Sequence, residues 1–284
     1  MTQPGGTNDP QMGGGSSGAQ SRNQDNAADL EVGRGVRMNV DSGHYGTSSP
    51  VDDRYTGGGY LANNSDWHEG GASWKAEQVA RMMARHRLRP ESICDVGCGT
   101  GGVLDSLRSH LPMEPRLTGY EIAEQAIELA PSERRATIEF INGSHEGDDR
   151  RFDLVLALDV FEHLEDYYGF LRSLRKKAPL AIFHIPIDTA VTSVLRPGPV
   201  LRSYRKVGHI QHYTPTLALE ALRHVGYRIV DHEHTIPARV AVPTSIRGRL
   251  GKAARLSLAR LDLDLGARLV PGFPLLVLAE TGEE

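Results

Sequence analysis

Between residues 92 and 185, short apolar segments alternate with segments whose apolar residues recur at helical spacing. The segment 152–158 is apolar at nearly every position, as expected of a strand that is buried on both faces. Strands that alternate with helices indicate a parallel sheet with helices on both faces. The predicted strands cover 92–96, 116–121, 137–141, 152–158 and 180–185, and the predicted helices cover 103–111, 122–130 and 165–177.

Two further helices are predicted outside this region. The first covers 73–86, with Ser73 as its N-cap. The second begins after Thr214, with Pro215 as its first residue, and ends before Gly226. Threonine at the N-cap, proline at the first position and glycine after the end are typical helix boundaries.

Two late apolar segments, 227–230 and 274–279, predict the last strands, and such a late pair suggests an antiparallel edge. The predicted fold is therefore α/β, with a doubly wound, seven-stranded, mostly parallel sheet whose last strand is antiparallel. Residues 186–212 show no clear period.

Composition divides the chain into two parts. Residues 1–50 are rich in Gly, Ser, Asn, Gln and Asp, so a disordered polar tail is expected there. Residues 51–284 are expected to form a single domain. The first 50 residues contain no long apolar run, so neither a signal peptide nor a membrane anchor is expected.

Charge and cysteine content limit the partners and the compartment. The formal net charge of −4 argues against a nucleic-acid binder, which needs basic side chains for phosphates. The two cysteines, Cys94 and Cys98, are too close together to cross-link the fold. A reducing cytoplasm is the natural compartment. We expect a cytoplasmic monomer or homodimer without stable membrane association.

A glycine-rich segment, residues 97–102, joins the first predicted strand directly to a helix. Glycines allow a sharp turn and the close approach of a ligand, and the helix N-terminus offers unpaired N–H groups. This pattern indicates a nucleotide site. A Walker loop is excluded because no Gly-Lys-Ser/Thr follows.

The same glycines formally satisfy the dinucleotide fingerprint, through Gly97, Gly99 and Gly102. Two features disfavour NAD. Asp95 stands where a dinucleotide-binding strand is usually apolar. In addition, the sequence contains only one of the two mononucleotide-binding halves of a dinucleotide-binding fold.

The segment 95–101 resembles the first motif of the class I S-adenosylmethionine-dependent methyltransferases. Three later segments resemble further motifs of that family in the correct order: the strand end at Glu121, residues 142–144, and residues 152–164. Residues 208–215 resemble a segment that is common in its bacterial small-molecule members. The resemblance implies a Rossmann-like fold and S-adenosylmethionine as the cofactor.

The resemblance also implies roles for individual residues. Glu121 matches the acidic residue that accepts both ribose hydroxyls, residues 142–144 match the segment beside the adenine, and the fourth-strand motif crosses the cofactor and faces the substrate. The implied cofactor-binding residues are Asp95, Gly97, Cys98, Gly99, Thr100, Gly101, Glu121, Ile122, Gly143, Ser144, Leu158, Asp159 and Val160.

Histidines are the candidates for catalysis, because a hydroxyl or protonated amine acceptor must lose a proton and imidazole titrates near neutral pH. His163 follows the fourth strand and is the predicted general base, with His209 as the alternative. A structural hydrogen-bonding role is the competing interpretation for both. Lys75 either meets the carboxylate of the methyl donor or is a solvated helix residue.

The acceptor is expected to be selected by two segments outside the sheet pattern, residues 55–75 and 186–212. Their candidate substrate-binding residues are Tyr60, Trp74, His209 and His212. No metal is expected: His232 and His234 could share one face of a strand, but no third ligand is evident.

The leading hypothesis is a methyltransferase that acts on a small molecule, at oxygen ahead of nitrogen or carbon. RNA or protein methylation and a catalytically silent cofactor-binding partner are the alternatives. An NAD-dependent oxidoreductase is disfavoured by Asp95.

Overall fold

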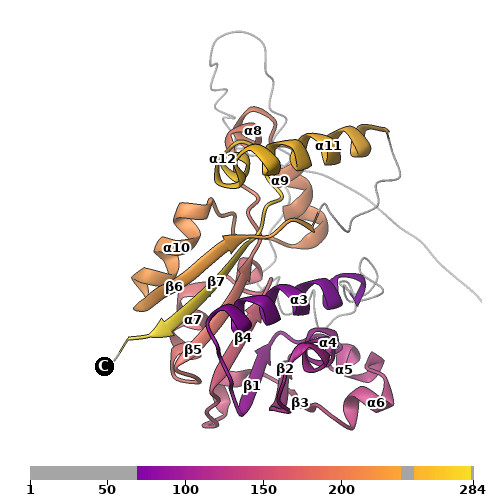
Figure 1. Ribbon diagram of the computed structural model, residues 1–284, viewed down its shortest axis with the longest axis vertical. Coiled ribbons are helices and arrows are strands. Elements are labelled where there is room, and N and C mark those ends of the chain that lie inside the picture. Colours follow the sequence, from indigo (N-terminus) through magenta and orange to yellow (C-terminus); the bar gives the residue numbers. More distant parts are fainter. Residues whose placement is uncertain (1–68, 238–245, 283–284) are drawn as a thin grey trace, which may run out of the picture. The chain divides into compact units, whose positions relative to one another are not determined.

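A computed structural model describes residues 69–237 and 246–282, which belong to one compact unit spanning Gly46–Glu284. Its centre is a seven-stranded sheet with the order β3-β2-β1-β4-β5-β7-β6 (Figure 1). The strands are β1 (Ser92–Val96), β2 (Arg116–Glu121), β3 (Glu139–Asn142), β4 (Leu154–Leu158), β5 (Leu180–Ile185), β6 (Tyr227–His234) and β7 (Leu275–Thr281).

Strands β1 to β5 run parallel to one another, and β7 is antiparallel to both β5 and β6. The predicted α/β fold, with its mostly parallel sheet and antiparallel last strand, is confirmed. The late pair does form one edge of the sheet, with β6 outermost and β7 inserted between β5 and β6.

Helices surround this sheet. They are α3 (Glu69–Arg85), α4 (Gly102–His110), α5 (Glu124–Leu129), α6 (Ser132–Arg135), α7 (Tyr167–Arg175), α8 (Val191–Leu195), α9 (Gly198–Arg202), α10 (Pro215–His224), α11 (Ile246–Leu261) and α12 (Leu263–Leu269). Two short 3-10 helices, η1 (His145–Gly147) and η2 (Phe161–His163), and one π-helical turn, η3 (Ser203–Val207), complete the described elements. No helix of the described residues is long and apolar enough to cross a membrane.

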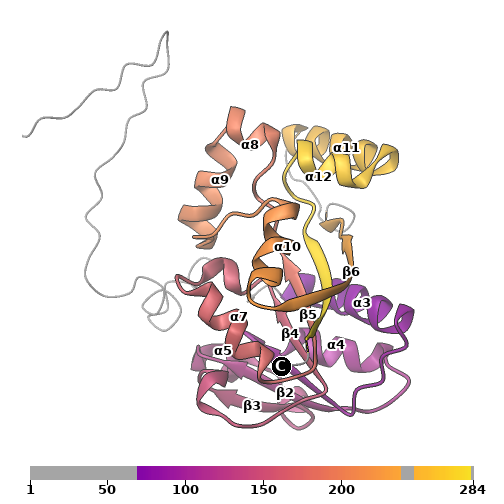
Figure 2. The same cartoon turned by 90° about the vertical axis from the view of Figure 1, so that its left-hand side faces the viewer.

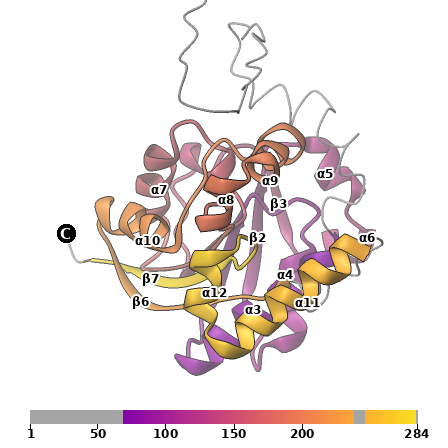
Figure 3. The ribbon, with the colours of Figure 1, turned by 90° about the horizontal axis from the view of Figure 1, so that it is seen from above.

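Two buried clusters hold the layers together, one on each face of the sheet. Helices α3 and α4 pack on one face, and α7 and α10 pack on the other (Figures 2 and 3). Along β4, Leu154 and Leu156 belong to the cluster beneath α3 and α4, whereas Val155 and Ala157 belong to the cluster beneath α7 and α10. This alternation explains why the whole strand is apolar.

Two predictions about element boundaries need correction, and one region without a clear period contains helices. Helix α3 begins at Glu69 rather than near residue 73, so Ser73 lies inside the helix and is not its N-cap. Strand β6 continues to His234, four residues beyond its predicted end. The region 186–212 contains α8, α9 and η3.

Other predicted features are present or lie outside the described residues. Thr214 caps α10 by accepting a hydrogen bond from the Leu217 amide at 3.2 Å, and Gly226 follows the helix with φ of 94°. The predicted polar tail, residues 1–50, and Tyr60 lie outside the part of the chain that the structure describes.

Candidate functional site

The candidate site lies where strand order changes direction. Strand β1 neighbours β2 on one side and β4 on the other, so the connections from β1 and β4 diverge at their carboxyl ends. Such a switch point is the usual ligand site of an open α/β sheet. The glycine-rich loop 97–101 follows β1, and residues 159–163 follow β4.

The backbone of the glycine-rich loop turns through positive φ values at Gly97 (80°) and Gly99 (56°). A Cβ atom on Gly97 would lie 2.7 Å from a methyl carbon of Val160, so this glycine allows the loop to pack against the segment after β4. A Cβ atom on Gly99 would meet nothing within 4 Å. The loop therefore closes against the protein at Gly97 and borders open space at Gly99.

Glu121, at the end of β2, supports the loop from the other side. One carboxylate oxygen accepts a hydrogen bond from the Gly99 amide at 2.9 Å, and the other accepts one from the Ala123 amide at 2.9 Å. Burial raises the pKa of Glu121 above its ordinary value.

Asp95 is 2% exposed and lies on β1, directly below the loop. Burial raises the pKa of Asp95 to about 7, with Lys75 lowering it and Glu121 raising it further. The site thus contains two buried carboxyl groups close to a loop that borders open space. This arrangement fits a ligand that carries hydroxyl groups and positive charge.

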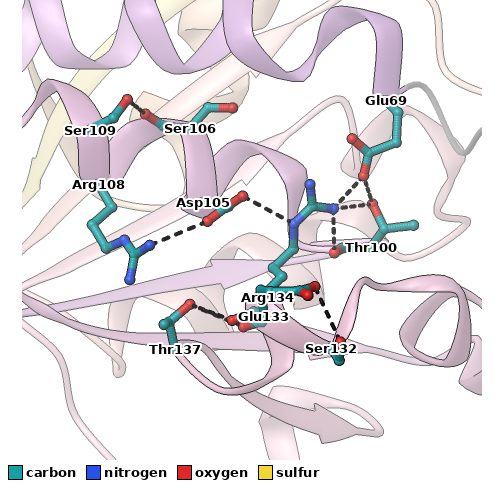
Figure 4. A network of polar contacts seen from close by, with 10 residues as sticks. All are labelled: Glu69, Thr100, Asp105, Ser106, Arg108, Ser109, Ser132, Glu133, Arg134 and Thr137. Carbon is teal, nitrogen blue, oxygen red and sulfur yellow. Dashed lines mark hydrogen bonds and ion pairs between the residues drawn. The ribbon is translucent and has the colours of Figure 1, made fainter.

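A second polar network fixes the far side of the loop (Figure 4). The Glu69 carboxylate, at the start of α3, accepts hydrogen bonds from the Thr100 hydroxyl and from the Arg134 guanidinium. Arg134 also donates to the Thr100 carbonyl at 3.0 Å and lies 3.4 Å from Asp105 of α4. Three helices, α3, α4 and α6, therefore hold Thr100 in place.

The other predicted cofactor-binding residues lie around the same edge. Cys98 is buried with its sulfur against Gly119, and burial raises its pKa. The Gly143 amide donates to the Glu121 carbonyl at 2.9 Å, and Ser144 caps η1. Leu158 is buried, Val160 packs against Gly97, Gly101 has φ of 76°, and Ile122 is 40% exposed.

Asp159 is the first residue after β4, and it has a positive φ of 60°. Its carboxylate lies 2.7 Å from Lys75 Nζ and 2.5 Å from His184 Nδ1. Burial opposes the ionised form, but the nearby His184 and Lys75 outweigh it and hold the pKa of Asp159 well below its ordinary value. Lys75 is therefore a partner of Asp159 rather than a solvated helix residue.

The predicted catalytic histidines lie together just beyond this pair. The rings of His163 and His209 are 4.9 Å apart in an edge-to-face arrangement. His163 Nδ1 lies 3.0 Å from the Gly208 carbonyl, and His209 Nδ1 lies 2.5 Å from an Asp188 carboxylate oxygen. His212 Nδ1 lies 3.6 Å from the same oxygen.

Backbone contacts join the two segments that carry these histidines. The Glu162 carbonyl accepts hydrogen bonds from the Ile210 and Gln211 amides, both at 2.9 Å. The structure therefore unites the predicted base, its alternative and His212, which are up to 49 positions apart in the sequence.

Trp74 is the residue before Lys75 on α3. Its ring contacts His184 edge-to-face at 5.8 Å, and it borders a hollow of about 430 Å³ between α3, β6 and α12. The hollow is lined by Trp74, Glu77, Gln78, Arg81, Arg85, Glu233, His234, Thr235, Ile236 and Leu263.

Three polar residues of the site were not singled out by the sequence patterns. Glu162 is fully buried beside His163, Asp188 joins His209 to His212, and His184 holds Asp159. A signal was present for two of them, because His184 lies near the carboxyl end of a parallel strand and Asp188 follows it.

Comparisons with known proteins agree with this geometry. A family model described as a methyltransferase domain matches residues 67–232, which is more than half of the chain. Two similar proteins are ubiquinone biosynthesis O-methyltransferases. The mitochondrial one from Schizosaccharomyces pombe (strain 972 / ATCC 24843) is 34% identical over 101 residues, covering 33% of this chain and 36% of that protein. The one from Methylobacterium sp. (strain 4-46) is 33% identical over 112 residues, covering 34% and 42%. The chain thus matches less than half the length of either relative.

Solved structures with the same fold include the magnesium protoporphyrin IX methyltransferase from Synechocystis PCC 6803. Its structure with bound S-adenosylhomocysteine has a TM-score of 0.55 at 16% identity, covering 82% of this chain and 98% of that one. Its structure with bound S-adenosylmethionine has a TM-score of 0.52 at 12% identity, covering 84% and 100%. The family match, the shared fold and the glycine-rich loop between Asp95 and Glu121 agree with one another. The chain belongs to the class I S-adenosylmethionine-dependent methyltransferases.

Proposed function

We propose that this methyltransferase transfers a methyl group to an oxygen atom of a small molecule. The observation that carries the proposal is the group of Glu162, His163 and His209 at the carboxyl edge of the sheet. One carboxylate oxygen of Glu162 and one ring nitrogen of each histidine lie within 4.8 Å of one another. A group of bases at this place suits an acceptor that must lose a proton. The two O-methyltransferase relatives support the choice of oxygen.

We further propose that the cofactor is held by the residues that the family resemblance implies. The open space at Gly99 leaves room for a ligand against the main chain, and Glu121 lies next to it with a buried carboxylate. When bound, S-adenosylmethionine supplies a methyl group on a sulfonium, which is already a strong electrophile. The task of the protein is then to align the acceptor, exclude water and remove a proton, and alignment alone contributes up to roughly 7–11 kcal/mol in favourable cases.

The hydrogen bonds of the two histidines prepare them to accept a proton. A carbonyl oxygen only accepts, so His163 donates its Nδ1 proton to Gly208, and the neutral ring carries its lone pair on Nε2. Likewise His209 Nδ1 faces the Asp188 carboxylate, which leaves the lone pair of the neutral ring on Nε2. His163 is the proposed base, and His209 is its alternative.

The test is transfer of a labelled methyl group from S-adenosylmethionine to two sets of small molecules of matched size, one bearing hydroxyls and one bearing amines. Label in an ether or ester is the expected result. Label that enters only amines, RNA or protein would overturn the proposal.

A variant pair tests the role of the histidine. His163→Ala is expected to lower kcat by about 100-fold or more, while the affinity for S-adenosylhomocysteine stays close to that of wild type. His232→Ala is the control, because His232 is exposed on β6. Wild-type turnover by His163→Ala would remove His163 from the mechanism.

A further inference from the structure

We propose that Glu162, His163 and His209 bind one zinc ion. One carboxylate oxygen and two imidazole nitrogens come from two segments, the turn after β4 and the segment before α10. Two histidines and one glutamate are a known ligand set for zinc with an open coordination position. The sequence predicted no metal, because no third ligand was evident for His232 and His234. His209 lies 46 positions after His163.

The distances are close to those that zinc requires. The candidate ligand atoms of the three residues all lie within 4.8 Å of one another, and His163 Nε2 lies 3.7 Å from a Glu162 carboxylate oxygen. Ligand atoms on one tetrahedral zinc ion lie roughly 3.4 Å apart, given bonds of about 2.0–2.1 Å. Small rotations of the side chains would therefore bring all three into contact with one ion.

Glu162 is the residue that most needs such a partner. Its side chain is fully buried, and neither of its carboxylate oxygens has a hydrogen-bond partner among the residues that the structure describes. A buried carboxylate without partners is strongly destabilising. Asp159 and Asp188 add negative charge near Glu162, against the positive charge of Lys75. A divalent cation at this place would bind one of these oxygens and balance the excess negative charge.

Both histidines also make the second hydrogen bond that zinc ligands usually make. A zinc-bound imidazole normally donates its other ring N–H to a carbonyl or carboxylate. His163 meets this requirement through the Gly208 carbonyl at 3.0 Å. His209 meets it through Asp188 at 2.5 Å, with the Ser203 hydroxyl 2.9 Å from the same nitrogen.

The main chain holds the two ligand segments together. Because the Glu162 carbonyl accepts from the amides of Ile210 and Gln211, the residues on either side of His209 cannot separate from the turn after β4 without breaking these bonds. A preformed arrangement of this kind lowers the ordering cost of metal binding.

The chemistry of the ion rests on the proposed function. Three protein ligands leave one position for the acceptor hydroxyl, and zinc lowers the pKa of a bound O–H group. On binding to the ion the hydroxyl would release its proton to solvent, so His163, whose ring nitrogen holds the ion, would not act as the base in the metal-bound chain. An oxygen–carbon bond would then form as the sulfur–methyl bond breaks, giving the methylated acceptor and neutral S-adenosylhomocysteine.

The test measures metal binding by the full chain, without any acceptor. Protein stripped with a chelator is titrated with Zn²⁺ by calorimetry, and with Co²⁺, whose visible absorption reports four- or five-coordinate nitrogen and oxygen ligation. Wild type is expected to bind one ion, and Glu162→Gln and His209→Ala are each expected to lower the affinity by about 100-fold or more. Asp188→Asn, which leaves all three ligands in place, is expected to lower it by about 10–100-fold.

His232→Ala controls for the loss of a histidine elsewhere, and thermal stabilisation by S-adenosylhomocysteine shows that each variant is folded. The proposal is overturned if wild type binds no ion, or if the ligand variants bind as tightly as His232→Ala does. The two proposals fail separately. Oxygen methylation by a chain without metal would leave His163 as a simple base, whereas a metal-binding chain that methylates only amines would refute the proposed function alone.

Discussion

Asp95 is a carboxyl group that folding removes from water almost completely. Its pKa rises from an ordinary 3.8 to about 7, so between these values the folded state holds a proton that the unfolded state releases. The folded state therefore loses stability as the pH rises through this window, by about 1.4 kcal/mol for each pH unit. Above about pH 7 both states are ionised, and the loss is complete.

Asp95→Asn is expected to remove this dependence, since asparagine does not titrate. The free energy of unfolding in urea, measured at pH 5 and at pH 8, should fall less for the variant than for wild type over this interval. Background titrations of other groups cancel in the difference. Equal pH profiles for the two proteins would contradict a raised pKa at Asp95.

The two glycines of the loop separate stability from ligand binding. Both Gly97→Ala and Gly99→Ala place a side chain at positive φ, which costs about 1–2 kcal/mol. Gly97→Ala also forces a Cβ atom to within 2.7 Å of Val160, so it is expected to lower the free energy of unfolding more than Gly99→Ala does. Gly99→Ala is expected to weaken S-adenosylhomocysteine binding at least about 10-fold, because its methyl group enters the open space. A normal affinity for Gly99→Ala would place the cofactor elsewhere.

For single residues, the positions of side chains at strand ends were predictable from the sequence, whereas contacts between turns distant in sequence were not. The positions of Asp95 and Glu121 follow from their places at the ends of parallel strands. The meeting of His163 with His209 depends on how the region 186–212 folds back, and that region has no hydrophobic period from which to predict it.

Among the elements, α3 depends on a contact far from it in sequence. Arg134 is 12% exposed and joins Glu69 of α3 to the carbonyl of Thr100. Arg134→Met is expected to lower the free energy of unfolding by about 1.5–3 kcal/mol, the usual range for a hydrogen bond to a charged group. It should also weaken S-adenosylhomocysteine binding about 10-fold, because Thr100 belongs to the loop.

Arg108→Met is the matched control for this variant. Arg108 is 43% exposed and lies 3.7 Å from Asp105, so its removal should cost less than about 1 kcal/mol and leave binding unchanged. If both variants lost the same affinity, the contacts of Arg134 with Glu69 and Thr100 (Figure 4) would not act on the loop.

Local sequence predicted which segments form helices and strands better than it predicted the residues at which these elements begin and end. The cap at Thr214 and the proline after it mark the start of α10 correctly. Helix α3 starts earlier than its apolar stripe indicates, because Glu69 is held by tertiary partners that local sequence does not specify.

In the molecule as a whole, β7 joins β6 to the rest of the sheet. Leu278 of β7 is 1% exposed, and Leu278→Ala is expected to lower the free energy of unfolding by about 2–5 kcal/mol. Leu217→Ala is the control, because Leu217 is 59% exposed on α10 and its loss should change stability by less than about 0.5 kcal/mol. Equal effects in chemical denaturation would mean that β7 does not hold the sheet together.

The insertion of β7 between β5 and β6 also has a consequence for biosynthesis. Ribosomes make this strand after the other six, so the facing edges of β5 and β6 have no partner until residue 281 has left the exit tunnel. Unpaired strand edges promote aggregation. A nascent chain stalled before β7 should therefore bind chaperones for longer than a completed one.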